Sequence, residues 1–443
     1  MAVAAGSGRL NLFQRMMLRW RDMHPYNAVH VVRVRRPLAE VPVAERIARA
    51  LEARGLTGLT LDRPRRRYRY AGGPAEVALE VLPGGSDPLA VVRDEIERQL
   101  NLPFPDAPRH NPFRFFVVTA GDAFHLGLAY DHFIAGGESI ALLLNAIAAA
   151  CGGDAVAGPE ASALDLYPAT YRGLATRRPA PFLRGLAGVP DAVARSRRSF
   201  RPRYRADAGA DVAFAYFRLD AAQLAGLRRA SADWGVTIND LFLAGLLLAL
   251  DPLAAGRRQR RRRTELGVAS IVNAREDFGA EPQRVFGQFL ASFSVLHPVP
   301  EGIALRELAR DVHACTARIR RDRLYLQTIM ALGLAGLMWP FLSERRRAGF
   351  FAKYHPVWGG VTPLNVDTLW RRSGGSELSW EYFRAVPTGP LSPLVFAVTT
   401  ARDTLHVGVT YRTAAFSPAM VDEVTGRFLR SVDALKEVVC RAA

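Results

Sequence analysis

The most constraining stretch of the sequence runs from residue 123 to residue 150 and reads AFHLGLAYDHFIAGGESIALLLNAIAAA. Residues 124–130 are apolar enough to form a buried strand, and residues 139–150 form an apolar run of helical length. The segment between them, 131-DHFIAGG-137, must therefore turn tightly from strand to helix. His132 lies in this turn, held by rigid elements on both sides. A histidine so placed can project into a cleft and act as a general base.

The length of the chain predicts two lobes, because 443 residues exceed what one ordinary hydrophobic core supports. Residues 1–150 alternate between strand and helix patterns and form the N-terminal lobe. Between residues 151 and 209 the pattern dissolves into proline, glycine and arginine with short helical pieces, which is typical of an interlobe linker. Strand and helix patterns resume over residues 210–443, the C-terminal lobe. Both lobes are therefore of the α+β class.

Hydrophobic periodicity predicts the individual elements. Helices are expected at residues 9–24, 43–54, 88–100, 139–150, 220–234, 237–250 and 417–439. Strands are expected at residues 28–35, 113–119, 124–130, 212–219, 266–272, 286–298, 358–366, 394–400 and 405–411. Residues 68–82 read as a strand pair broken by two glycines, and Ser139 is a candidate cap for its helix. The run 256-GRRQRRRRTE-265 is charged enough to be a solvated loop.

The net charge of +17 is carried almost wholly by arginine, since Lys353 and Lys436 are the only lysines. A positive surface attracts phosphate-bearing acyl carriers, acidic carrier proteins, coenzyme A or anionic lipid. The arginines are scattered without a nucleic-acid-binding motif, so we expect no nucleic-acid partner. Cys151, Cys315 and Cys440 lack metal or redox spacing, which predicts no metal site and a reducing compartment. The first residues show no signal-peptide pattern, so a cytoplasmic location is expected.

The turn 131-DHFIAGG-137 resembles the HHxxxDG motif of the condensation-domain and coenzyme-A-dependent acyltransferase superfamily. This superfamily includes chloramphenicol acetyltransferases, plant acyltransferases with an HxxxD motif, and wax-ester/diacylglycerol acyltransferases. Other parts of the family pattern are matched in order by PFRFFVVTAGDAFHLGLAYDH, VTINDLFLAGLLLAL, VFGQFLASFSV and GPLSPLVFAVTTARDTLHVGVTYRTAAFSPAMVDEVTGRFL. The resemblance therefore covers most of the chain.

The resemblance implies two chloramphenicol-acetyltransferase-like lobes in a V-shaped arrangement with a central tunnel. An acyl thioester on coenzyme A or on the phosphopantetheine arm of an acyl carrier protein would enter from one face, with no bound cofactor. A hydroxyl or amine acceptor, on a natural product or a lipid, would enter from the other. His132 matches the second histidine of the motif, which deprotonates the acceptor or steadies the tetrahedral intermediate. No GxSxG elbow suggests a covalent acyl-enzyme.

Two departures from the motif bear on activity. Asp131 replaces the first histidine, and Gly136 replaces the aspartate of the family. In relatives that carboxylate pairs with an arginine, which Arg275 matches here. A buried arginine without a partner is costly, so we expect either that the site is open to water or that another carboxylate substitutes, with four candidates: Glu276, Asp277, Asp131 and Glu138. The lost aspartate also raises an alternative function, a non-catalytic relative that binds a carrier protein or other partner.

Three further positions are candidates for supporting roles. Ser292 lies where the crossing strand of the family carries a polar residue, and either helps to stabilise an oxyanion or is an ordinary strand hydroxyl. Gly136 and Gly137 are expected to permit backbone conformations that are closed to other residues.

Residues 324–342 are apolar apart from Gln327 and Thr328, and basic residues flank both ends. The segment is long enough to span a bilayer, but Pro340 lies inside it and strands of one lobe precede and follow it. A core helix is therefore the first interpretation. The wall of an acyl tunnel, or a helix in peripheral contact with a membrane surface and helped by the arginines at 345–347, are the alternatives.

Overall fold

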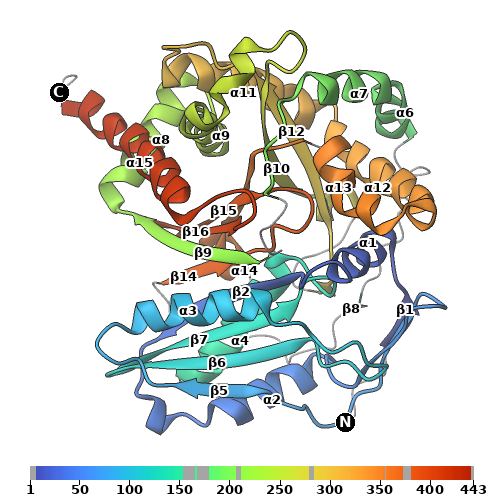
Figure 1. Cartoon of the computed structure of the whole chain (residues 1–443). Coiled ribbons are helices and arrows are strands. Elements are labelled where there is room, and N and C mark those ends of the chain that lie inside the picture. The colour runs from blue at the N-terminus through green and yellow to red at the C-terminus, as the bar shows by residue number, and fades with distance from the viewer. Residues whose placement is uncertain are drawn as a thin grey trace.

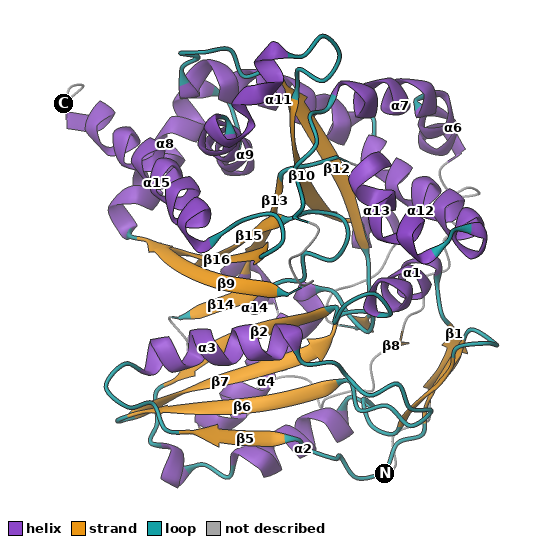
Figure 2. Cartoon of the chain, viewed as in Figure 1, coloured by secondary structure: helices purple, strands orange, loops and turns teal. Residues whose placement is uncertain are grey.

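The computed structural model describes residues 6–152, 165–166, 179–205, 211–278, 284–354, 356–372 and 381–440. It shows two lobes, each built on its own β-sheet and covered by helices (Figure 1, Figure 2). This confirms the predicted α+β class. The expected linker lies partly outside the described residues, and its described part contains β8 (Asp165–Leu166), α6 (Pro179–Ala187) and α7 (Val189–Arg198).

The N-terminal lobe is built on a five-stranded sheet in the order β14-β2-β7-β6-β5. These strands are β2 (Asn27–Val34), β5 (Leu79–Leu82), β6 (Phe113–Ala120), β7 (Ala123–Asp131) and β14 (Tyr382–Ala385). The helices of this lobe are α1 (Leu12–Arg21), α2 (Val43–Ala53), α3 (Pro88–Asn101) and α4 (Gly137–Gly152), with a short turn η1 (Leu38–Glu40). A small second sheet joins β1 (Gly6–Arg9), β4 (Arg67–Tyr70) and β3 (Leu59–Asp62).

The C-terminal lobe is built on a six-stranded sheet in the order β12-β10-β13-β15-β16-β9. Its strands are β9 (Val212–Leu219), β10 (Leu266–Asn273), β12 (Leu290–His297), β13 (Gly359–Asn365), β15 (Leu394–Ala401) and β16 (Thr404–Arg412), while β11 (Val285–Phe286) pairs with β8. The helices are α8 (Ala221–Trp234), α9 (Ile238–Leu250), η2 (Pro252–Gln259), α10 (Arg275–Phe278), α11 (Leu305–Arg321), η3 (Leu324–Leu326), α12 (Gln327–Met338), η4 (Trp339–Phe341), α13 (Glu344–Tyr354), α14 (Val366–Arg372) and α15 (Pro418–Cys440).

The two lobes share elements at their junction. Strand β14 comes from the C-terminal part of the chain but pairs antiparallel with β2 at the edge of the N-terminal sheet. Helix α3 packs on the N-terminal sheet and also reaches the first strand of the other lobe (Figure 1). There Asn101 exchanges two hydrogen bonds with the backbone of Val212, at 2.7 and 2.9 Å. A continuous layer of buried residues therefore joins the sheets.

The hairpin that leads to the motif forms as predicted. Strands β6 and β7 pair antiparallel from Phe113↔Tyr130 to Ala120↔Ala123, which leaves only Gly121 and Asp122 in the turn. Gly121 has φ +65°, a conformation in which glycine avoids the strain of a Cβ atom. All nine residues of β7 are buried, as the apolar sequence indicated.

Four local predictions are wrong. Residues 68–82 do not form a strand pair, because β4 and β5 belong to different sheets. Ser139 does not cap α4, which begins two residues earlier at Gly137. The expected strand 286–298 is interrupted, since residues 287–289 separate β11 from β12. The charged run 256–265 is not wholly solvated, because Arg257 is fully buried, pairs with Asp251 and donates to backbone carbonyls.

Candidate functional site

His132 follows directly after β7 and is buried against both the sheet and the C-terminal lobe. Its backbone N–H donates to the carbonyl of Tyr26 at 3.1 Å. Its ring packs against the rings of Tyr26 and Tyr130, with centroids 5.6 and 5.5 Å away. Nδ1 of the imidazole has no hydrogen-bond partner within the described part of the chain. The side chain is thus held by packing, while its basic nitrogens are not committed to a protein donor.

Burial lowers the pKa of His132 to about 4. The neighbouring carboxylate of Asp131 raises this pKa, whereas the guanidinium of Arg384 lowers it, and burial has the largest effect. The imidazole is therefore neutral at physiological pH and can accept a proton.

Asp131 is turned away from the Arg275 side of the motif. Its carboxylate accepts a hydrogen bond from Arg21 of α1 at 2.5 Å and another from Nε2 of His110 at 3.1 Å. All three side chains are almost fully buried. Asp131 therefore fixes the end of β7 to helix α1, and it is not the substitute partner of Arg275.

Glu138 is the carboxylate that pairs with Arg275. Its Oε2 lies 3.1 Å from Nε of Arg275, at the first turn of α4. The same guanidinium donates to the hydroxyl of Ser139 at 2.5 Å and to the carbonyl of Val285 at 2.9 Å. The structure thus selects one of the four candidates: the negative charge missing at residue 136 is supplied two residues later. The buried arginine is compensated, and it links α4 to the C-terminal lobe.

The backbone explanation for Gly136 and Gly137 is wrong, because neither residue has a positive φ. What favours glycine at residue 136 is a close approach. A Cβ atom there would lie 3.3 Å from Oε1 of Gln288, which is tighter than most such contacts. At residue 137 a Cβ atom would be 3.4 Å from the guanidinium of Arg384, an ordinary contact distance.

Gln288 attaches the C-terminal lobe to the motif turn. Its Nε2 donates to the carbonyls of His132 and Ala135, and the N–H of Gly136 donates to the carbonyl of Gly287 at 3.0 Å. These bonds come from residues 287–289, the interruption between β11 and β12. Because residues 287–289 are not paired in a sheet, their backbone and side-chain groups are free to bond to the motif turn.

Arg384 was not predicted from the sequence. It lies on β14, is buried, and donates to Thr399 Oγ1 at 3.2 Å, to the carbonyl of Val398 at 3.2 Å and to the carbonyl of Thr362. It forms no ion pair with a carboxylate among the described residues, and burial lowers its pKa to about 10. A charged residue inside an otherwise apolar strand, 382-YFRA-385, was the signal that could have identified it.

A buried polar layer lies beneath the motif beside Arg384. Nδ1 of His30 is hydrogen-bonded to the hydroxyl of Tyr382 at 2.5 Å, and its Nε2 lies 3.5 Å from the hydroxyl of Tyr130. Burial holds the pKa of His30 well below its ordinary value, with repulsion from Arg384 as a smaller cause. The cationic charge in this layer therefore resides on Arg384.

Ser292 lies on the edge strand β12 and is engaged by helix α12. Thr328 accepts from the N–H of Ser292 at 3.2 Å and donates to its carbonyl at 2.5 Å. The two hydroxyls are 3.3 Å apart. Leu290, on the same face of β12, lies 3.8 Å from the position of a Cβ at Gly136, so this face of the strand points toward the motif. The oxyanion role of Ser292 stays a prediction.

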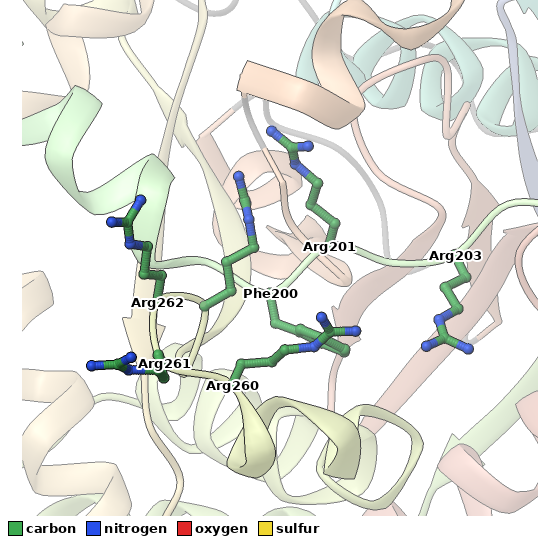
Figure 3. A pocket seen from close by; sticks show the side chains of 7 residues that line it. Phe200, Arg201, Arg203, Arg260, Arg261 and Arg262 are labelled. Carbon is green, nitrogen blue, oxygen red and sulfur yellow. The ribbon is translucent and has the colours of Figure 1, made fainter.

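A separate cavity of about 770 Å³ lies elsewhere in the C-terminal lobe (Figure 3). Its lining, which we call the arginine basin, consists of Phe200, Arg201, Arg203, Arg260, Arg261, Arg262 and Arg263. The arginine basin lies near the start of β10, because its residues Phe200 and Arg263 flank the bridge between Ser199 and Glu265. Arg275 follows the other end of that strand. Eight strand residues span roughly 25 Å. The arginine basin is therefore distant from His132.

The described residues contain no group of three or more histidine, cysteine or acidic side chains that could hold a metal ion. Cys151 is buried, and burial raises the pKa of its thiol to about 11. Cys315 is partly buried, and its pKa is also raised by burial. Neither thiol is therefore poised as a nucleophile.

Comparison with solved structures identifies the fold. The first condensation domain of the calcium-dependent antibiotic synthetase, in complex with a substrate analogue, superposes with a TM-score of 0.71 at 17% identity, over 97% of this chain and 97% of that one. The epimerization domain from the third module of tyrocidine synthetase B gives 0.65 at 14% identity, over 98% and 97%. The EpoB cyclization-docking bidomain from Sorangium cellulosum gives 0.66 at 14% identity, over 97% and 85%.

No protein-family model matches the sequence, and no curated protein matches it significantly. The similarity to known proteins is therefore one of fold. The chain has the two-lobed fold of condensation domains along almost its whole length, and the resemblance inferred from the degenerate motif is confirmed at the level of fold.

Proposed function

We propose that this protein is an acyltransferase of condensation-domain type, which moves an acyl group from a thioester to an amine or hydroxyl acceptor. The observation that carries the proposal is the state of His132. Its imidazole is neutral, it follows a fully buried strand, and groups from the C-terminal lobe hold its turn. A rigidly held imidazole that is neutral at physiological pH has a lone pair with which to accept a proton as a general base.

The reaction needs one proton relay. The imidazole of His132 takes the proton of the acceptor N–H or O–H as the acceptor attacks the carbonyl carbon of the thioester. The carbon–sulfur bond then breaks, and the imidazolium returns the proton to the departing thiolate. The products are the acylated acceptor and a free thiol, so the imidazole is regenerated.

In this scheme, the other groups near the motif hold the two lobes together and stabilise the charges that develop during the reaction. Arg384 places a buried positive charge near His132, which opposes protonation of the resting imidazole and favours negative charge developing nearby. Arg275 and Glu138 hold α4 against the C-terminal lobe. Ser292 is a candidate donor to the oxyanion of the tetrahedral intermediate.

A thioester on the phosphopantetheine arm of a carrier protein is the favoured donor over acyl-coenzyme A. The structural neighbours include parts of nonribosomal peptide synthetases. A condensation domain among them was solved in complex with a substrate analogue. The net charge of +17 suits an acidic or phosphate-bearing donor. The acceptor is proposed only as an amine or alcohol.

The test is mass spectrometry of the purified protein with a panel of acyl-carrier and acyl-coenzyme A thioesters and mixed amine and alcohol acceptors. His132→Ala should abolish product formation. His125→Ala is the matched control, because His125 is buried on β7, the strand that leads to His132, and contacts Glu381 instead. Product from the wild type and from His125→Ala, but not from His132→Ala, supports the proposal. Equal turnover in all three proteins contradicts a base role for His132.

The alternative is a non-catalytic protein that binds a carrier protein through the same cleft. Its main support was the missing aspartate at residue 136, and the pairing of Glu138 with Arg275 weakens that support. Absence of product across the panel, together with tight carrier-protein binding that His132→Ala leaves unchanged, would favour this alternative.

A further inference from the structure

Helix α12 carries an exposed apolar face. Residues 324–342 contain no charged side chain, yet only a third of the segment Leu324–Phe341 is buried. Leu337 is 73% exposed and Phe341 is 86% exposed. Five large apolar side chains are exposed among the described residues of α12, of η4 and of the adjacent helix α6. We call this set the apolar face: Leu183, Leu334, Leu337, Met338 and Phe341. Soluble proteins rarely leave so many large apolar side chains together in water, so this face has a partner.

The segment is long and apolar enough to cross a bilayer, with a mean hydropathy of 1.4, but its packing opposes a span. The inner side of α12 belongs to the protein interior through Ile329, Leu332 and Ala335. Strands β12 and β13, on either side of it in the sequence, both pair with β10 in one sheet. A spanning helix would separate strands that are hydrogen-bonded to a common neighbour. The helix is therefore a surface element with an uncovered outer side.

Arginines lie near the C-terminal end of α12, beginning on the side that packs against α1. Helix α1 lies beside α12 (Figure 1), and Arg19 of α1 donates to the carbonyl of Gly336 at 3.0 Å. Burial lowers the pKa of Arg19, and so does repulsion from three neighbouring arginines, Arg15, Arg66 and Arg347, whereas the carboxylate of Asp22 raises it. Arg347 itself donates to the carbonyl of Trp339 in η4. The four arginines form a cationic border whose mutual repulsion an anionic partner would relieve.

We propose that the apolar face and its arginine border bind the surface of an anionic lipid bilayer, with the axis of α12 in the plane of the interface. Apolar side chains enter the headgroup–acyl boundary, while the arginines contact lipid phosphates. The charge of the border decides the occupant: a second copy of this chain would bring the same arginines to the contact, whereas an anionic bilayer is complementary. The inference is independent of the acyl-transfer chemistry proposed for His132.

Co-sedimentation with vesicles tests this proposal. The wild type should bind vesicles of phosphatidylcholine mixed with phosphatidylserine far better than vesicles of phosphatidylcholine alone, and high salt should weaken this binding. The double variant Leu337→Gln/Phe341→Gln should lose binding by about tenfold or more, because it removes two apolar anchors. The matched control Val81→Gln/Leu102→Gln, which changes two exposed apolar residues in the N-terminal lobe, should bind like the wild type.

Arg15→Gln separates the electrostatic part of the binding. It should lower binding to the anionic vesicles and reduce the salt dependence, with little effect on neutral vesicles. Binding to neither vesicle overturns the proposal. Equal losses in the apolar-face variant and its control overturn it as well. A dimer in light scattering that Leu337→Gln/Phe341→Gln dissociates, without vesicle binding, would assign the face to a second copy instead.

The arginine basin supports a second, independent inference. Its six arginines come from two segments that face one another across Phe200 (Figure 3), and no acidic side chain lines it. Nε of Arg201 is buried and has no hydrogen-bond partner within the described residues. Burial and repulsion from Arg201 lower the pKa of Arg263. Six like charges therefore line one hollow, and the Nε of Arg201 is a buried donor there that no described group accepts.

We infer that the arginine basin binds a phosphate-bearing anion of small size. Guanidinium groups match phosphate oxygens in paired hydrogen bonds, and the cavity volume is in the usual range for small ligands. The position of the basin, at the other end of β10 from Arg275, makes it an accessory site outside the acyl-transfer cleft.

Calorimetric titration with inorganic pyrophosphate tests the inference. Arg260→Ser/Arg262→Ser should weaken binding by about tenfold or more, because two donors are lost. Arg93→Ser/Arg229→Ser removes the same charge from exposed positions elsewhere and should leave binding almost unchanged. Absence of heat from the wild type contradicts the inference. Equal weakening in both double variants contradicts it too, since only the net charge would then matter.

Discussion

At the scale of single residues, the site depends on how two opposite charges, Asp131 and Arg384, act on the imidazole of His132. Asp131 is occupied by Arg21 and His110, so its effect on His132 is limited to raising a pKa that burial depresses. Arg384 acts in the opposite sense and has no carboxylate partner among the described residues. The surroundings of the motif therefore keep His132 neutral in the resting protein.

The pKa of His132 predicts a pH dependence of stability. Its folded-state pKa is about 4, below the ordinary 6.5, so the unfolded chain takes up a proton first as the pH falls. The free energy of unfolding is unaffected by this group above pH 6.5 and decreases between pH 6.5 and 4, by about 2–3 kcal/mol near pH 4.5. Urea unfolding of the wild type and His132→Gln near neutral pH and near pH 4.5 measures this. An equal acid loss in both proteins would show that His132 does not titrate as described.

The pairing of Arg275 predicts the effect of removing one charge. Glu138→Gln keeps the size of the side chain but leaves the buried guanidinium without a carboxylate, so we expect a loss of about 1–3 kcal/mol in the free energy of unfolding. Glu45→Gln is the matched control, because Glu45 pairs with Arg49 on the exposed surface of α2 and should cost about 0.5 kcal/mol or less. Chemical denaturation compares the two variants. Similar small losses would mean that Arg275 is satisfied by Ser139 and Val285 alone.

Restoring the family aspartate is expected to fail. In Gly136→Asp the new Cβ would crowd Oε1 of Gln288, and its carboxylate would approach that oxygen and the carbonyl of Gly287. We expect a loss of about 1–2 kcal/mol in stability and no gain in activity. Gly136→Ala, which adds the Cβ without the charge, isolates the electrostatic part. Greater thermal stability of Gly136→Asp than of Gly136→Ala would show that a partner for this carboxylate exists.

At the scale of elements, the sequence predicted what local patterns encode. The hairpin β6–β7 and the helix after it were found because alternation, a short polar turn and an apolar helical run coincide there. Strand β14 was missed, since four residues including Arg384 lack any distinguishing period and pair with a strand about 350 residues away. Likewise, no local signal separates β4 from β5 into different sheets or places Gln288 on the motif turn. These features depend on tertiary pairing.

A variant in the segment between β11 and β12 is expected to affect the site, because Gln288 of this segment holds the motif turn. Gln288→Met preserves side-chain volume but leaves the carbonyls of His132 and Ala135 without a donor, so we expect a loss of about 2–3 kcal/mol in stability and a lower kcat. Gln223→Met, at a buried glutamine that bonds Asp433 on α15, should destabilise the protein without lowering kcat. Steady-state kinetics well below both melting temperatures separate the cases. An unchanged kcat for Gln288→Met would mean that the motif turn keeps its geometry without the hydrogen bonds from Gln288.

At the scale of the whole molecule, the shared strand makes the lobes interdependent. Phe383 of β14 is buried and packs against Tyr216, with ring centroids 4.7 Å apart, although β14 pairs within the N-terminal sheet. Arg384 beside it donates to residues of the C-terminal sheet. Chains of this length often unfold lobe by lobe. Here the edge strand of the N-terminal sheet is held by the core of the C-terminal lobe, so the N-terminal sheet loses β14 when the C-terminal lobe unfolds.

This interdependence predicts that a cavity in one lobe destabilises both. Phe242 lies on α9 and packs against Phe428, wholly within the C-terminal lobe. Phe242→Ala should cost about 3–5 kcal/mol. If the lobes unfold together, hydrogen exchange measured by mass spectrometry will accelerate by the same factor for the slowest amides of β7 in the N-terminal lobe and of β15 in the C-terminal lobe. Acceleration confined to β15 would show that β14 does not couple the lobes. It would also mean that the C-terminal lobe can open around His132 without loss of the N-terminal sheet, which would make lobe separation a route for substrate entry.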